Sequence, residues 1–271
     1  MMSPLAGAVE VVPGPRDFAL LHERAIPQKD QLCGPFWGAL TLSAVGHPVN
    51  QEEVALRAGT TLAQGDPAGW LPPGASPRTD YATTIPVAAD ETSSGTSASG
   101  VARSIEALSG GTLAVVPVAG PWTADTVISL VEITAAQAPE CALIANLRTG
   151  RLWGSRAPVR LLLDHLLGLP VEVPPPDWDC GHFLTIAACM SGPGGALIAL
   201  RDTYPQLGWG GYHLQPARAV AAALERGDGH EGGVLCACEA PAAEALAGRL
   251  GEVGFELRHW DNGSSDRDGE R

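Results

Sequence analysis

The order of hydrophobic and polar positions predicts that the first half of the chain is mainly helical. In residues 33–45 the side chains of Trp37 and Leu40 recur at helical spacing on one apolar face. Pro35 suits the first turn of this helix, where its missing N–H is not needed. Similar periodicity with capping residues predicts four more helices, over residues 16–24, 50–58, 97–109 and 124–137.

Short, continuous apolar runs predict buried strands, most clearly in the second half of the chain. Residues 182–190 and 196–201 are two such runs, and the glycine-rich segment 191–195 between them predicts an antiparallel hairpin. Two earlier runs predict strands over residues 112–118 and 141–147. The other predicted elements are helices over residues 159–167 and 216–226, and a strand, a helix and a strand over residues 233–238, 240–251 and 254–260.

Together these elements predict an α+β fold, in which a helical group packs on an antiparallel sheet. We expect one large domain over residues 26–228, preceded by an irregular lead-in over residues 1–25. Residues 64–100 are rich in Gly, Pro, Ser and Thr and predict a long surface loop, and residues 150–176 predict an insertion. The predicted organisation ends with a small β-α-β appendage over residues 229–260 and a disordered tail over residues 261–271.

Charge and apolar content exclude several classes of protein. The formal net charge of -13 argues against a nucleic-acid or anionic-membrane partner, because both need a basic surface. The N-terminal residues have no signal-peptide pattern, and the longest apolar runs are too short to span a bilayer. We therefore expect a cytoplasmic protein whose six cysteines are mostly thiols.

One cysteine and one histidine are placed for nucleophilic chemistry. A cysteine reacts as its thiolate, and the positive end of a helix and a neighbouring imidazolium both favour that form. Cys33 stands just before the N-terminus of the first apolar helix. His182 opens a buried strand and Asp202 ends the strand paired with it, so Asp202 is expected to hold one ring nitrogen and leave the other for Cys33. His213, in the loop after Asp202, is the alternative base.

Three segments carry a family resemblance: CGPFWGALTLSAVG at 33–46, GHFLTIAACM at 181–190 and DTYP at 202–205. In this order they resemble the signatures of papain-like cysteine peptidases, nearest the branch that contains the bacteriocin-processing, double-glycine peptidases. The resemblance covers about residues 26–215 and implies a papain-like fold. It also implies that Cys33 is the nucleophile, His182 the base and Asp202 the residue that orients the base.

The resemblance further implies a glutamine shortly before the nucleophile, whose amide helps to form the oxyanion hole. Gln28 lies five residues before Cys33, one fewer than the family spacing, and is our first choice, with Gln31 as the alternative. Where a tryptophan directly follows the catalytic cysteine in papain-type enzymes, Phe36 here precedes Trp37, and in that register the nucleophile would be missing. We expect the cleft to be lined by Gly34, Trp37, Gly181 and Trp209.

These residues predict a thiol-dependent hydrolase that cleaves a peptide or amide bond through an acyl-enzyme and needs neither a cofactor nor a metal. Its partner is a peptide or a small acyl substrate. Two alternatives use the same cleft: an acyl or amide transferase in a biosynthetic pathway, and a catalytically inactive peptide-binding pseudoenzyme. A weaker alternative is a zinc protein that uses Cys180, His182 and the pair Cys236 and Cys238, although the spacing departs from the usual zinc patterns.

Overall fold

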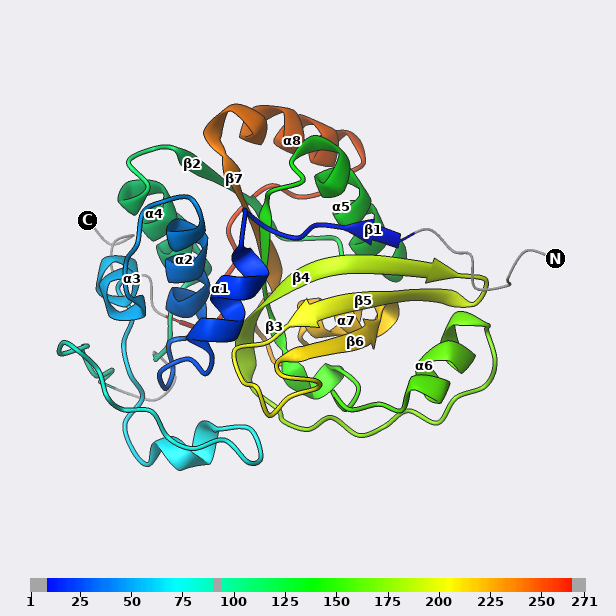
Figure 1. The fold of residues 1–271 in the computed structure, drawn as a ribbon, viewed down its shortest axis with the longest axis horizontal. Helices are drawn as coiled ribbons and strands as arrows, with labels where there is room; N and C mark the ends of the chain where they lie inside the picture. The colour runs from blue at the N-terminus through cyan, green and yellow to red at the C-terminus, as the bar shows by residue number, and fades with distance from the viewer. Residues whose placement is uncertain (1–8, 90–93, 265–271) are drawn as a thin grey trace.

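The computed structural model describes residues 9–89 and 94–264, which contain a seven-stranded antiparallel sheet with helices packed against it (Figure 1). The strands are β1 (Val9–Val11), β2 (Leu113–Val118), β3 (Ala142–Arg148), β4 (Gly181–Gly192), β5 (Gly195–Arg201), β6 (Tyr212–Pro216) and β7 (Gly233–Glu239). Their order is β2-β7-β3-β4-β5-β6, and β1 pairs with the C-terminal part of β4. The α+β class predicted from the sequence is confirmed.

Two groups of helices cover the sheet. Successive side chains of a strand point to opposite faces of the sheet, so each central strand contacts both groups. In β3, Ala142 and Ile144 pack in one apolar cluster, and Leu143 and Ala145 pack in the other. The first group is α1 (Phe18–Ala25), α2 (Cys33–Ala44) and α4 (Ala98–Leu108), with α3 (Gln51–Ala58) packed on α2 and α4. The second is α5 (Ala124–Gln137), α7 (Ala217–Glu225) and α8 (Ala240–Glu252), while α6 (Val159–Leu166) lies beside β5.

Three helices begin where a side chain accepts a hydrogen bond from a backbone N–H of the first turn. Asn50 does so for α3, Ser97 for α4 and Thr123 for α5. The N-cap of α2 is Leu32, which has no side-chain acceptor. The first N–H groups of α2 are therefore left without a side-chain cap at the point where Cys33 stands.

The start of α2 packs closely against β4. A Cβ atom at Gly34 would lie 2.9 Å from Val101 of α4 and 3.3 Å from Phe183 of β4, so glycine permits this approach. Trp37, one turn later, is fully buried and donates a hydrogen bond from its indole N–H to the carbonyl oxygen of Phe183 at 3.0 Å. These contacts hold Cys33 against the strand that carries His182.

The predicted C-terminal appendage is wrong. β7 does not form a separate unit, because it pairs with β2 on one side and with β3 on the other, near the middle of the single sheet. All residues of β7 except its last are buried, which is typical of a strand covered on both faces. Residues 254–260 are not a strand, although Glu256 exchanges backbone hydrogen bonds with residues 119 and 120.

The two ends of the described chain are also more ordered than predicted. Within the expected lead-in, β1 pairs with β4 and α1 packs on α2. Residues 1–8 of that lead-in and residues 265–271 of the expected disordered tail lie outside the described residues. The described part of the tail is folded, since Asn262 is buried and donates a hydrogen bond to the carbonyl oxygen of Thr96 at 3.0 Å.

The predicted long loop is attached to the helical group at several points. It contains a short 3₁₀ helix, η1 (Pro67–Trp70). Two β-bridges, from Thr61 to Gly95 and from Leu62 to Val87, join the loop to the residues that follow α3. Residues 90–93 of this loop are outside the described part. No helix in the described ranges is long and apolar enough to cross a membrane.

Candidate active site

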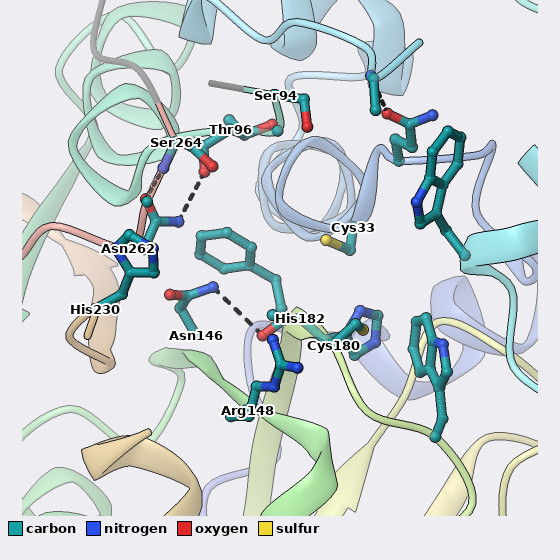
Figure 2. A pocket seen from close by; sticks show the side chains of 18 of the residues that line it. Cys33, Ser94, Thr96, Asn146, Arg148, Cys180, His182, His230, Asn262 and Ser264 are labelled. Carbon is teal, nitrogen blue, oxygen red and sulfur yellow. Dashed lines mark hydrogen bonds between the residues drawn. The ribbon is translucent and has the colours of Figure 1, made fainter. Parts of the chain in front are cut away.

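A cavity of about 500 Å³ opens between the start of α2, the C-terminal end of β3 and the start of β4. Cys33 and His182 both line this cavity. Figure 2 shows the Cys33 sulfur pointing into it, with the His182 ring below. The remaining walls come from the segment before α2, the long loop, the segment before β4, Tyr204, the segment at the end of α7 and residues 262–264, so distant parts of the chain meet here.

The Cys33 thiol and the His182 ring lie close together in the cavity wall. Cys33 is the first residue of α2, and its thiol is free and partly buried. The side chains of Cys33 and His182 line the same cavity, and the thiol lies close enough to the imidazole to help raise its pKa. The Nε2 atom of His182 lies 3.1 Å from Oδ1 of Asp202, which leaves Nδ1 as the ring nitrogen for the sulfur.

The charge of Asp202 favours the protonated form of His182. Burial has the largest single effect and lowers the pKa of His182, which is 1% exposed. The charge and hydrogen bond of Asp202, and then the contact with Cys33, outweigh it and raise the pKa of His182 to about 10. The histidine therefore carries a proton at neutral pH, next to the sulfur that would have to ionise.

Asp202 directly follows β5 and is held from several sides. Its Oδ1 atom also accepts a hydrogen bond from the backbone N–H of Tyr204 at 3.2 Å, and its backbone carbonyl accepts one from Nε2 of His22 at 2.7 Å. Burial favours the neutral carboxyl, but the charge and hydrogen bond of His182, and to a smaller extent His213, hold the pKa of Asp202 below its ordinary value. Asp202 is therefore an anion fixed beside the imidazole.

Two aromatic rings cover His182, and neither was predicted from the sequence. Trp178 packs edge-on to the imidazole with ring centres 5.0 Å apart, and Tyr204 stacks on it at 6.2 Å. Trp209 was expected from the sequence to line the cleft. That residue is 51% exposed, pairs with Tyr212 in a turn, and is absent from the cavity wall. Trp178 covers the imidazole because the fold places it beside His182. Trp209 follows Asp202 in the chain but does not reach the cavity.

The predicted cleft residues are divided between the wall and the core. Gly181 lines the cavity, as expected for the residue before His182. Gly34 and Trp37 do not line it, because they face α4 and β4 behind the cysteine. Their contribution is to position the first turn of α2.

Of the two candidate glutamines, Gln28 has the side-chain amide with fewer hydrogen bonds to the rest of the protein. Gln28 lines the cavity and is 2% exposed, and its Oε1 atom has no hydrogen-bond partner among the described residues. Gln31 also lines the cavity, but its Oε1 atom accepts a hydrogen bond from the backbone N–H of Ala63. Gln31 therefore holds the long loop in place, and Gln28 remains the stronger candidate for the oxyanion hole.

The other end of the cavity is polar. Arg148, at the end of β3, bonds to Asp179 through Nε at 2.6 Å and to Asp228 through Nη1 at 3.4 Å. Asn146, His230, Asn262 and Ser264 also line the cavity, and Figure 2 shows them to the left of the Cys33 sulfur. Sequence reasoning missed this group because its members come from β3, the segment after α7 and the C-terminal segment, which only folding brings together.

Comparison with known proteins places the chain in a family. Residues 12–261 match a family of unknown function, DUF6885. The chain belongs to DUF6885. No curated protein and no solved structure matches it. The DUF6885 region contains all three residues of the Cys33–His182–Asp202 arrangement.

The cysteines proposed for zinc lie in separate parts of this DUF6885 chain. Cys180 and His182 line the cavity, whereas Cys236 and Cys238 pack in the apolar cluster between the sheet and α5, α7 and α8. There they contact Cys141, whose pKa is raised by burial and by these two thiols. The described residues contain no group of three or more His, Cys, Asp or Glu side chains that could hold a metal ion.

Proposed function

We propose that this chain is a cysteine-dependent hydrolase of papain-like fold that cleaves a peptide or amide bond through an acyl-enzyme on Cys33. The observation that carries the proposal is that one cavity holds the Cys33 thiol close to His182, whose ring lies 3.1 Å from the carboxylate of Asp202. A nucleophile, a base and a residue that orients the base are the parts that acyl transfer requires. The helical group that carries the cysteine and the antiparallel sheet that carries the other two residues support the papain-like fold.

The first half of the reaction follows from the charges in the site. The Cys33 thiolate attacks the carbonyl carbon, and the negative oxygen of the tetrahedral intermediate accepts hydrogen bonds from the Gln28 amide and the uncapped start of α2. The C–N bond then breaks, and the protonated ring of His182 donates its proton to the leaving amine. The products are a thioester on Cys33 and a free amine.

In the second half, neutral His182 takes a proton from water, and the resulting hydroxide attacks the thioester carbonyl. The carboxylic acid leaves and the thiolate is regenerated beside the protonated ring. If an amine reached the thioester in place of water, the same residues would catalyse acyl or amide transfer. Product analysis with a peptide or nitrophenyl ester in the presence of added amine separates hydrolysis from transfer.

Iodoacetamide labelling tests the proposed nucleophile. We expect Cys33 to be alkylated at least ~10-fold faster than free cysteine near pH 6, because the protonated His182 stabilises a thiolate there. Mass spectrometry of tryptic peptides measures the rate for each cysteine. Cys180 provides the comparison within the cavity, since burial and the charge of Cys33 raise its pKa. Equally slow labelling of Cys33 and Cys180 would support the inactive peptide-binding module instead.

Replacement of Gln28 tests the oxyanion hole. Gln28→Ala is expected to slow acylation by p-nitrophenyl acetate ~100-fold, since one donor to the developing negative charge is lost. Alkylation by iodoacetamide should keep its rate, because that reaction forms no oxyanion. Gln31→Ala is the matched control, and it should loosen the contact with Ala63 without a comparable loss of acylation. A parallel decrease of both reactions in Gln28→Ala would mean that Gln28 only maintains the structure.

A further inference from the structure

Asp202 lies between two buried histidines, and the reaction described above uses only one of them. Oδ1 of Asp202 is 3.1 Å from Nε2 of His182, and Oδ2 is 3.7 Å from Nε2 of His213. His213 lies on β6, is 4% exposed, and its Nε2 atom has no other hydrogen-bond partner among the described residues. A buried histidine aimed at the free oxygen of a buried carboxylate requires an explanation.

The hydrogen bonds of Gln215 determine which nitrogen of His213 carries the proton. Oε1 of Gln215 accepts a hydrogen bond from the backbone N–H of Trp153 at 2.8 Å, and Nε2 donates one to the carbonyl oxygen of Trp153 at 2.9 Å. The orientation of the amide is therefore fixed. Its Nε2 atom also lies 3.1 Å from Nδ1 of His213, and an amide nitrogen can only donate. Nδ1 of His213 must accept, so the proton of the neutral ring is on Nε2.

We propose that His213 is a positioning residue, which Gln215 holds as the neutral Nε2–H tautomer so that it donates to Oδ2 of Asp202. The proposal that this geometry serves catalysis rests on the proposed function. Both His182 and the Tyr204 N–H use Oδ1, so Oδ2 depends on His213 for a donor. The distance of 3.7 Å is longer than a formed hydrogen bond, and catalytic hydrogen bonds often shorten in the substrate complex.

Among the titratable side chains of the described residues, His182 and His213 are the two that hold the pKa of Asp202 below its ordinary value. From α1, His22 bonds to the backbone carbonyl of Asp202 and not to the carboxylate. The guanidinium of Arg201, the preceding residue, donates to the carbonyl oxygen of Pro13. Cys33 at the start of α2 and Cys180 before β4 line the cavity with His182, and Tyr204 stacks on the imidazole. Burial, and then neighbouring charges that include Asp202, raise the pKa of Cys180 and of Tyr204.

The tautomer can be measured without any activity. In protein labelled with ¹⁵N-histidine, long-range ¹H–¹⁵N correlation spectra distinguish a protonated from an unprotonated ring nitrogen, and the His213 signals are assigned by their loss in His213→Gln. We expect Nε2 of His213 to be protonated and Nδ1 unprotonated near neutral pH. The opposite tautomer, or a doubly protonated ring, would overturn the proposal. Gln215→Met should remove the donor to Nδ1 and produce a mixture of tautomers. An unchanged spectrum would show that Gln215 does not fix the tautomer of His213.

Two neutral variants test the role in catalysis. The amide nitrogen of glutamine reaches the position of Nε2, so His213→Gln keeps a donor to Asp202, whereas the shorter His213→Asn does not. We expect His213→Asn to acylate with p-nitrophenyl acetate about 10- to 100-fold more slowly, because Asp202 and His182 lose their alignment. We also expect the acid limb of its pH–rate profile to move to higher pH, since an unpartnered buried carboxylate is protonated more easily. His213→Gln should restore most of the rate and the wild-type limb.

The outcomes separate this proposal from the proposed function. If the wild-type protein does not form an acyl-enzyme, the proposed function fails, and the spectra still decide the tautomer. If the wild-type protein reacts and both His213 variants keep its rate and its acid limb, the positioning role is wrong. Equal losses in the two variants with an unchanged acid limb would show that His213 only fills space.

Discussion

Cys33→Ala is expected to remove acyl transfer, with a decrease of at least ~1000-fold in the release of nitrophenolate from p-nitrophenyl acetate. The sulfur is the atom that forms the thioester, and no other described side chain combines the start of a helix with a contact to His182. Intact-mass spectrometry after rapid acid quenching should detect the acetyl adduct on the wild-type protein and not on the variant. Folding of the variant is checked by its thermal unfolding, which the replacement of one partly buried thiol should change little.

Cys180→Ala is the matched control for this experiment. Cys180 lines the same cavity and is a free thiol, but burial raises its pKa, and its sulfur accepts a hydrogen bond from the hydroxyl of Thr149 at 3.9 Å. The control is expected to keep the acetyl adduct and most of the rate. If Cys180→Ala lost the adduct while Cys33→Ala retained it, the nucleophile would be Cys180, and the mechanism would have to be rebuilt around it.

His182→Ala is expected to reduce acylation by ~1000-fold, because proton transfer by a positioned side chain contributes 10²–10⁴-fold and this ring also stabilises the thiolate. Its loss should therefore slow alkylation by iodoacetamide as well, which distinguishes it from Gln28→Ala. His230→Gln is the matched control, since His230 lines the same cavity but has no contact with Asp202 among the described residues. A decrease of similar size in both variants would mean that the polar end of the cavity, rather than the base, limits the reaction.

The pH dependence of the same reaction follows from the pKa of His182. Because that pKa is raised, the protonated ring is present through the neutral range, and its contributions to thiolate formation and to folding stability are lost as the pH rises through about 10. Asp202→Asn removes the negative charge that raises the pKa. The alkaline limb of the alkylation profile should then move to lower pH in this variant. An alkaline limb that does not move would show that Asp202 does not control the charge of His182.

Local sequence signals predicted the elements that carry the candidate site. The helix of residues 33–44 follows from its apolar spacing and from Pro35 in its first turn, and the β4–β5 hairpin follows from two apolar runs around a glycine-rich turn. The capped helices begin at the expected residues for the same reason, because capping is an interaction within a few residues. The antiparallel pairing of β4 and β5 then brings Asp202, at the end of β5, to the edge of the sheet where β4 begins with Gly181 and His182.

The errors share a different cause. The strand over residues 233–238 was predicted as part of a β-α-β appendage, because it is followed by a helix and a further apolar run, whereas β7 inserts between β2 and β3. Its continuous burial was visible in the apolar run of residues 233–238, and that pattern indicates a central strand. Trp209 was predicted to line the cleft, whereas the ring that packs on the imidazole is that of Trp178, which no local pattern in the sequence indicated.

By itself, the sequence determined the α+β class, the helix that begins at Cys33 and the strands that end near His182 and Asp202, because each depends on contacts between residues close in the chain. Only the tertiary structure decided the position of β7, the rings that cover His182 and the polar end of the cavity. It alone also set His213 and Gln215 behind Asp202. These features arise where distant segments exclude water together, and no local pattern records which segments will meet.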